Sequence, residues 1–242
     1  MEYYIYEKIS VVKDTLTIEK DPLRKHLSTV LRKKVGENLE LCDGKGNLFR
    51  CKILYISKNI IKLEVIERKK IEYDTKVKVT LFLSHLRNMS RFEFAIEKCV
   101  ELGVIKIIPV ITDNTVNKSP LSKHKLLRLK NIIKSATGQS QRCYLTELSE
   151  SIYLKDINKF TGNGEKIVMY EFADYNKNFE LNFNNYNINL LIGPEGGFNE
   201  NEVSFLIENG WKTYSLGNRK LRAETAAIVS VYELINHSII KK

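Results

Sequence analysis

Short apolar runs and turn residues dominate the first 70 residues of the chain. The runs predict three strands, at 38–42, 48–54 and 60–66. The segment 43–47, Asp-Gly-Lys-Gly-Asn, has the glycines and short polar side chains of a tight turn between the first two strands. A short helix is predicted within 22–35, with an apolar face made of Leu23, Leu27, Val30 and Leu31. Strands with one helix in so short a stretch predict a small β-barrel.

From residue 77 onward the pattern alternates between strands and helices. Strands are predicted at 77–83, 104–111, 167–170, 188–192 and 213–216, and helices at 90–102, 123–137, 199–209 and 225–240. Alternation of this kind predicts an α/β domain with a largely parallel sheet. The charged segment 68–76 separates the two patterns, so we expect two domains, at 1–70 and 75–242.

The most informative segment is the glycine-rich loop Gly193–Gly197, which follows the strand predicted at 188–192 and leads into a helix. Asn199 and Glu202 have the spacing of an N-terminal capping box, and Gly210 has the place of a C-terminal cap. Ligands of α/β sheets bind outside the carboxyl ends of strands. The glycine spacing fits neither a dinucleotide fingerprint nor a P-loop. The loop is therefore either a binding loop of another kind or a plain turn between strand and helix.

A second loop with similar features spans residues 215–226. It also follows a predicted strand and precedes a helix, and it carries Arg219, Arg222 and Glu224. A glutamate at this place is also favoured simply by the dipole of the helix that begins there. If the two loops belong to neighbouring strands, they lie side by side at one edge of the sheet and together form a binding site.

The charge of the chain indicates a polyanionic partner. It has 39 basic and 29 acidic residues, a formal charge of +10, and residues 1–70 alone hold 16 basic and 10 acidic side chains. Residues 114–146 contain no acidic side chain. Solvated helix faces give similar runs of charge. The candidate residues for contact with the phosphates of a nucleic acid are Arg24, Lys25, Arg32, Lys33, Lys34 and Arg142.

Several other classes of protein are not supported by the sequence. The four cysteines are scattered without a C-x-x-C pair, which favours reduced thiols over disulfides or zinc ligands. The four histidines are dispersed, so no metal site is expected. No run of about 18 apolar residues and no secretory signal are present, which predicts a cytoplasmic protein without a membrane span.

Five segments, in order along nearly the whole chain, resemble motifs of the RsmE family, the bacterial 16S ribosomal RNA (uracil-N3)-methyltransferases of the SPOUT superfamily. They are 24–46 (RKHLSTVLRKKVGENLELCDGKG), 97–104 (EKCVELGV), 136–142 (ATGQSQR), 193–198 (GPEGGF) and 216–227 (LGNRKLRAETAA). The resemblance implies an N-terminal PUA-like β-barrel that binds RNA. It also implies a trefoil-knotted α/β methyltransferase domain and a homodimer.

The same resemblance implies an S-adenosylmethionine (SAM) cofactor and a small-ribosomal-subunit substrate. By position, the cofactor would lie among loops at 169–171, 191–197 and 216–225. The implied cofactor-binding residues are Met169, Leu191, Ile192, Gly193, Pro194, Glu195, Gly196, Gly197, Leu216, Gly217, Leu221 and Thr225.

Two residues of the second loop are candidates for the chemistry of methyl transfer to N3 of a uridine. Arg222 can stabilise the uracil anion that develops as the N3 proton is lost, because a guanidinium keeps its charge and can fork onto a carbonyl oxygen. Glu224 is either a general base or a helix-capping residue. Two other functions stay open: a SPOUT methyltransferase of another rRNA or tRNA site, and a non-enzymatic RNA-binding factor for ribosome assembly.

Overall fold

The structure, a computed structural model, describes residues 3–19, 21–72, 75–173 and 187–240. The chain forms two compact units. The first unit comprises residues 1–74 together with 134–145, and the second comprises 75–133 and 146–242. The sequence pattern does not predict the inclusion of 134–145 in the first unit, because nothing in a helical periodicity tells which sheet the helix meets.

The first unit is a six-stranded sheet. Its strands are β1 (Tyr3–Ile5), β2 (Val11–Val12), β3 (Thr15–Ile18), β4 (Asn38–Cys42), β5 (Asn47–Ile56) and β6 (Ile61–Lys70). The strand order is β1-β4-β5-β6-β3-β2, with β1 parallel to β4 and all other pairs antiparallel. The three strands predicted here are confirmed. The three N-terminal strands were not predicted, because two to four residues are too few to show an alternating pattern.

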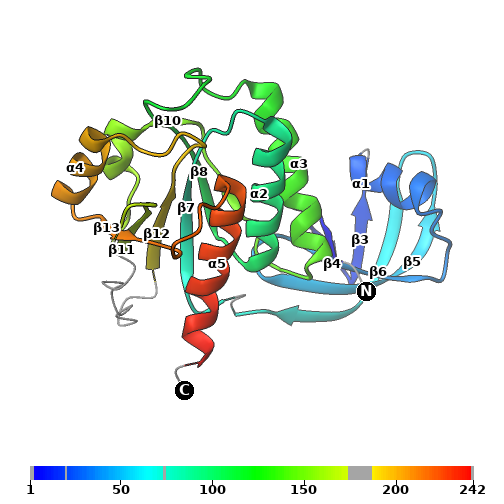
Figure 1. Cartoon of the computed structure of the whole chain (residues 1–242). Helices are drawn as coiled ribbons and strands as arrows, with labels where there is room; N and C mark the ends of the chain where they lie inside the picture. Colours follow the sequence, from blue (N-terminus) through cyan, green and yellow to red (C-terminus); the bar gives the residue numbers. More distant parts are fainter. Residues whose placement is uncertain (1–2, 20, 73–74, 174–186, 241–242) are drawn as a thin grey trace. The chain divides into compact units, whose positions relative to one another are not determined.

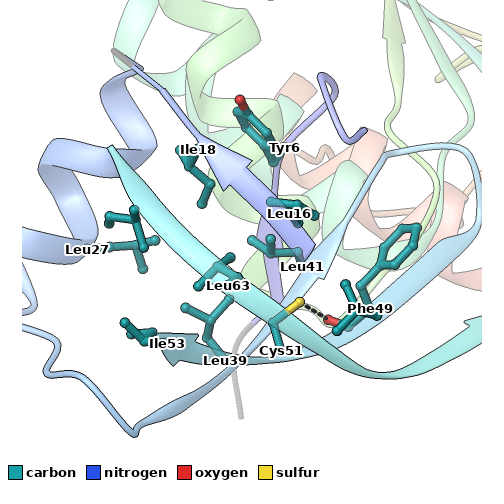
Figure 2. Packing of buried hydrophobic residues seen from close by; sticks show 12 residues of the cluster. Tyr6, Leu16, Ile18, Leu27, Leu39, Leu41, Phe49, Cys51, Ile53 and Leu63 are labelled. Carbon is teal, nitrogen blue, oxygen red and sulfur yellow. Dashed lines mark hydrogen bonds between the residues drawn. The ribbon is translucent and has the colours of Figure 1, made fainter. Parts of the chain in front are cut away.

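Alternation of side chains builds the core of this unit. In β6, Ile61, Leu63 and Val65 are buried while Lys62 and Glu64 are exposed, as a strand with one face on the core requires. Figure 2 shows the resulting cluster, with Leu16, Ile18, Leu39, Leu41, Ile53 and Leu63 pointing toward one another. The buried Cys51 thiol donates to the carbonyl of Phe49 at 3.7 Å.

The helix predicted at 22–35 is shorter than expected. It consists of α1 (Pro22–Lys25), capped by the Asp21 side chain, and a π-helical turn, η1 (His26–Val30). Leu27 is fully buried, but the side chains of Val30 and Leu31 are exposed. The prediction that these two residues belong to the core face is wrong, because the wider π turn shifts the angular position of every residue after it.

The second unit holds a parallel seven-stranded sheet. Its strands are β7 (Lys78–Ser84), β8 (Lys106–Ile111), β9 (Glu147–Leu148), β10 (Ile152–Tyr153), β11 (Glu165–Met169), β12 (Asn187–Ile192) and β13 (Lys212–Tyr214). The order is β10-β8-β7-β12-β11-β13, and β9 also pairs with β8. The predicted α/β class with a parallel sheet is confirmed. The trefoil knot implied by the resemblance stays a prediction.

Four helices and one 3-10 turn accompany the strands in the described residues of this part of the chain. They are α2 (Met89–Leu102), α3 (Lys123–Gln139), the 3-10 turn η2 (Leu154–Lys159), α4 (Glu200–Glu208) and α5 (Ala223–Ile240). The end of α3, from residue 134 onward, belongs to the first unit. Figure 1 shows α2 and α5 side by side, with α5 packed on β7 and β12, and α4 beside β13 at the edge of the sheet. Alternate residues of the central strands, such as Phe82 and Leu191, face a separate cluster that includes Leu206 and Trp211.

Candidate functional site

Three strands of the second unit end in register at one edge of the sheet. Met169 of β11 pairs with Ile192 of β12 on one side and with Tyr214 of β13 on the other. The Tyr170 N–H then donates to the Tyr214 carbonyl at 2.9 Å, just beyond the last pair. Because the strands are parallel, the three loops that follow them leave from the same edge. The glycine loop follows β12 and the second loop follows β13. These two strands are not neighbours as expected, because β11 lies between them. The loop after β11 therefore lies between the other two loops.

These three loops enclose a pocket of about 470 Å³, within the usual range for a small-molecule site. Ten of the residues predicted for the site line it: Met169, Ile192, Gly193, Pro194, Glu195, Gly197, Leu216, Gly217, Leu221 and Arg222. Phe172, Ala173, Phe198 and Tyr214 also line the pocket, although they lie just outside the predicted loops. Ser215 and Ala226 line it as well; they are the first and last residues of the second loop and were not named as site residues. Proximity to the predicted loops is the one signal in the sequence that could have identified these six residues.

Four predicted site residues are not among those that line the pocket. Leu191 is fully buried in the cluster beneath the sheet, on the opposite side of the strand from Ile192. Gly196 is exposed and faces Asn114, and Thr225 is exposed on the first turn of α5. The fourth is Glu224. Whether a residue of a strand or helix faces the pocket depends on the direction of its side chain. Matching the family motifs residue by residue does not include that direction.

Glu224 lies buried at the start of α5, facing α2. Its side chain is 10% exposed, and its Oε1 is 3.7 Å from Arg91 Nε. No described residue hydrogen-bonds to its Oε2. This buried carboxylate therefore pairs with the more exposed Arg91 across the two helices, and its geometry gives no support to the role of a general base in the pocket.

The glycine loop has a defined backbone conformation. The Gly197 N–H donates to the Pro194 carbonyl at 2.9 Å and closes a turn, with Gly197 in the left-handed region at a φ of +66°. At Gly193, a Cβ would lie 2.9 Å from the ring of Phe198. Larger side chains would therefore displace the ring or strain the turn. Both glycines leave backbone atoms, and no side chain, facing the pocket.

The helix after this loop is fixed at both ends, as predicted. The Asn199 side chain accepts from the Glu202 N–H at 2.8 Å, and the Glu202 carboxylate accepts from the Asn199 N–H at 3.0 Å, which is the capping box. At the other end, the Trp211 N–H donates to the Leu206 carbonyl and the Gly210 N–H to that of Ile207. The glycine loop thus meets a rigid helix.

Charged side chains surround the mouth of the pocket. Lys220 pairs with Glu171 at 3.2 Å and so connects the loops after β13 and β11. Arg219 and Arg222 are exposed on the same loop as Lys220. The Glu195 carboxylate accepts from the backbone N–H of Arg87 at 3.1 and 3.2 Å. The two carboxylates of the described lining are thus engaged, whereas the guanidinium of Arg222 is available to a ligand.

His85, at the carboxyl end of β7, is buried and uncharged at neutral pH. Burial lowers the pKa of this imidazole to about 4. Its Nε2 lies 3.0 Å from the Ser151 hydroxyl, which in turn accepts from the Leu121 N–H at 3.1 Å. The ring also meets Phe92 edge to face. His85 therefore holds the segment before α3 in place and does not line the pocket.

The predicted RNA-binding residues differ in accessibility. Lys25, Arg32 and Lys34 are exposed, whereas Lys33 is half-buried and pairs with Glu37 at 3.2 Å. Arg24 is also half-buried. Arg142 is only 6% exposed, so its guanidinium is not free to meet a phosphate. Of the exposed residues, Lys25 ends α1, and Arg32 and Lys34 lie in the turn after η1.

The described residues form neither a metal site nor a membrane span. No group of three or more histidine, cysteine or acidic side chains in this part of the chain could hold a metal ion. No helix in the described ranges is long and apolar enough to cross a membrane. The four cysteines are buried and form no disulfide, and burial raises the pKa of the Cys51 thiol to about 12.

Comparison with known proteins agrees with both units. Residues 73–234 match the RNA methyltransferase domain family, and residues 20–66 match the RNA methyltransferase PUA domain. The ribosomal RNA small subunit methyltransferase E of Mesomycoplasma hyopneumoniae is 35% identical over 84% of this chain and 86% of its own length. The enzyme of the same name from Rickettsia conorii is 31% identical over 86% of this chain and 84% of its own length.

Solved structures agree as well. The ribosomal RNA small subunit methyltransferase E of Neisseria gonorrhoeae, solved bound to S-adenosyl methionine, superposes with a TM-score of 0.86 at 26% identity, over 99% of this chain and 98% of its own. Fold and pocket thus define an RNA methyltransferase with an N-terminal PUA-like β-sheet domain. More particularly, the chain belongs to the ribosomal RNA small subunit methyltransferase E family.

Proposed function

We propose that this protein transfers a methyl group from SAM to N3 of one uridine in the 16S rRNA of the small ribosomal subunit. The main observation behind the proposal is the pocket at the ends of β11, β12 and β13, which end in register. Glycine backbone lines this pocket, and lysine and arginine side chains surround its mouth. Relatives that share the fold over nearly their whole length are named as small-subunit rRNA methyltransferases, and one was solved with SAM bound.

The residues that line the pocket fit this cofactor. Ile192, Leu216 and Leu221 offer apolar surface for an adenine ring. Backbone groups of Gly193, Gly197 and Gly217 can meet the polar edge of the base and the ribose without interference from side chains. When bound, SAM supplies a methyl group already activated by its sulfonium centre, so the chain need not provide a covalent intermediate.

The remaining work of the protein is alignment and charge stabilisation. Alignment of reacting groups contributes up to about 7–11 kcal/mol in favourable cases. The exposed Arg222 guanidinium lies on the pocket wall. Its positive charge can stabilise the negative charge that develops on a uracil carbonyl as the N3 proton leaves. Since Glu171 and Glu195 are engaged and Glu224 is buried elsewhere, the proton passes to solvent.

The first unit supplies the RNA-binding surface in this proposal. Lys25, Arg32 and Lys34 provide exposed cations for phosphates. Arg142 is left out because it is buried. A ribosomal substrate also implies a cytoplasmic protein.

We include a homodimer in the same proposal. Along α5, Thr225, Val229 and Tyr232 form an exposed stripe, with Val229 40% and Tyr232 58% exposed. Exposed apolar residues at helical spacing suit an interface with a second copy. Sedimentation of the wild type and of Tyr232→Glu measures this: a dimer that the substitution dissociates supports the interface, and a monomeric wild type contradicts it.

The decisive experiment is transfer of a labelled methyl group from SAM to small ribosomal subunits purified from cells that lack the enzyme. Nucleoside analysis of the product identifies the modified atom. We expect a single N3-methyluridine in 16S rRNA. Labelling of tRNA, or at another rRNA site, would instead support a methyltransferase with a different target. SAM binding without any transfer would support a non-enzymatic assembly factor.

A further inference from the structure

A short loop after β8 contacts the glycine loop, although β8 and β12 are not adjacent in the sheet. The loop spans residues 112–115 and begins directly after Ile111. It is closed on itself: the Thr112 N–H donates to the Thr115 hydroxyl at 3.0 Å, and the Thr115 N–H donates to the Thr112 carbonyl at 3.2 Å. Both threonines are buried, so the turn has a fixed conformation.

Asn114, at the tip of this loop, holds two successive carbonyls of the glycine loop. Its Nδ2 donates to the Gly196 carbonyl at 3.1 Å and to the Gly197 carbonyl at 3.2 Å. One amide nitrogen has two hydrogens, so this group satisfies both oxygens at once. A Cβ at Gly196 would lie 3.2 Å from the Asn114 Cβ. Because the Asn114 side chain comes so close, a glycine suits position 196, although this residue does not line the pocket.

The neighbouring residue fixes the same loop to α4. The Asp113 N–H donates to Glu202 Oε1 at 2.8 Å, and the Asn199 side-chain amide donates to Asp113 Oδ2 at 2.9 Å. The Glu202 carboxylate therefore serves two partners, since its other oxygen completes the capping box. With the loop held on both sides, Asn114 loses little conformational freedom when it binds the glycine loop.

We propose that Asn114 is a positioning residue for the SAM pocket, acting through the backbone of Gly196 and Gly197. Its amide keeps both carbonyls turned toward the loop after β8, which leaves Gly197 oriented on the pocket wall before any ligand arrives. Without the amide, the two peptide units can rotate, and the cofactor must order them when it binds. The inference rests on the proposed function, because it takes SAM as the occupant.

The test is calorimetric titration of SAM into the wild type, Asn114→Ala and Asn114→Asp. At pH 7.5 we expect about tenfold weaker binding for Asn114→Ala, the size of one or two lost hydrogen bonds. Asn114→Asp is isosteric, but its carboxylate faces two carbonyl oxygens, so we expect at least a hundredfold loss.

Turnover gives a second measure. With small subunits as substrate, the KM for SAM should rise in step with the dissociation constant, while kcat at saturating SAM falls less than threefold. Asn117→Ala is the matched control: it is an exposed asparagine of the same segment, and its side chain accepts from the Ser119 N–H at 3.1 Å rather than contacting the glycine loop. It should bind SAM like the wild type. Thermal unfolding of each variant checks the fold, and Asn114→Ser replaces any variant that fails to fold, with the same expected loss as alanine.

The outcomes separate the two proposals. A wild type that does not bind SAM contradicts the proposed function itself. A wild type that binds, with Asn114→Ala and Asn114→Asp within twofold of it, overturns the role of Asn114. An Asn114→Asp variant that binds SAM no more weakly than Asn114→Ala also overturns it, because the proposed role requires a hydrogen-bond donor at this position.

Discussion

At the scale of single residues, burial decides what each charged group can do. Arg222 and Glu224 are two positions apart, yet one is exposed on the pocket wall and the other is 8% exposed against Arg91. A helix that begins between them turns successive side chains in different directions. Burial likewise distinguishes Lys34, which is exposed, from Arg142, which is buried. A count of basic residues therefore overestimates the number of cations that a partner can reach.

Replacing Arg222 tests the role proposed for its charge. Arg222→Ala should lower kcat about 100- to 1000-fold, the usual cost of one lost charge-stabilising group. SAM affinity should change less than threefold, because the glycine backbone and the apolar side chains assigned to the cofactor stay in place in the pocket wall. Single-turnover methyl transfer and SAM titration measure the two effects. Arg219→Ala is the control, and an equal loss of binding and transfer in Arg222→Ala would count against the role.

The buried His85 predicts a pH dependence of stability. Its pKa is about 4 in the folded protein against an ordinary value of 6.5, so the unfolded chain binds a proton between these values that the folded chain does not. Stability should therefore be complete above pH 6.5 and fall as the pH drops toward 4, by roughly 2–3 kcal/mol from this group.

Urea unfolding of the wild type and of His85→Gln, at pH 7 and pH 5, measures this contribution. Glutamine keeps a hydrogen-bonding side chain but does not titrate, so its loss of stability on acidification should be smaller. His124→Gln provides the comparison, since that histidine is exposed. Identical pH dependence in all three proteins would disprove the assignment.

At the scale of elements, helix α4 shows how local signals place a functional loop. Its capping box was predicted from Asn199 and Glu202, and the structure confirms it. What periodicity could not show is the second partner of Glu202, the Asp113 N–H, which brings the loop after β8 to the glycine loop. Asp113 and Glu202 are 89 residues apart in the sequence, so their contact cannot be predicted from a local sequence pattern.

Gly210 tests the C-terminal cap of this helix. It has a φ of +81°, and a Cβ there would meet nothing within 4 Å. Gly210→Ala should thus lower the free energy of unfolding through backbone strain alone, by about 1–2 kcal/mol. Chemical denaturation measures the change. Ser204→Ala, at an exposed position of the same helix, should be neutral within about 0.5 kcal/mol; an equally neutral Gly210→Ala would mean that the cap is not strained.

At the scale of the whole molecule, the excess positive charge fits an RNA partner, and the small-subunit rRNA methyltransferase family supplies that partner class. Charge alone indicates a polyanion of unspecified kind, whereas the similarity to known proteins indicates ribosomal RNA. Attraction of this kind is screened by salt, because bound phosphates release their counterions.

RNA affinity should therefore fall steeply as salt rises. Removing Arg32 and Lys34 together should weaken binding and reduce the slope of log affinity against log salt by about one to two units. Filter binding of 16S rRNA fragments between 50 and 200 mM salt, the range over which such losses are typically about 10³-fold or more, measures the slope. Lys58→Ala, an exposed lysine of the β5–β6 turn, is the control. A slope that the double substitution leaves unchanged would place the RNA elsewhere.

The sequence by itself determined the two patterns of secondary structure, the alternation typical of a parallel sheet and the caps of α4, because each depends on neighbours within a few residues. The ten predicted residues of the pocket lining followed mainly from the resemblance to a known family. Only the tertiary structure decided that β11 lies between the two loops, that Glu224 is buried, that 134–145 belong to the first unit and that Asn114 holds the glycine loop. These depend on strand order and on contacts between distant segments, and the free energy of such contacts is set by packing in three dimensions.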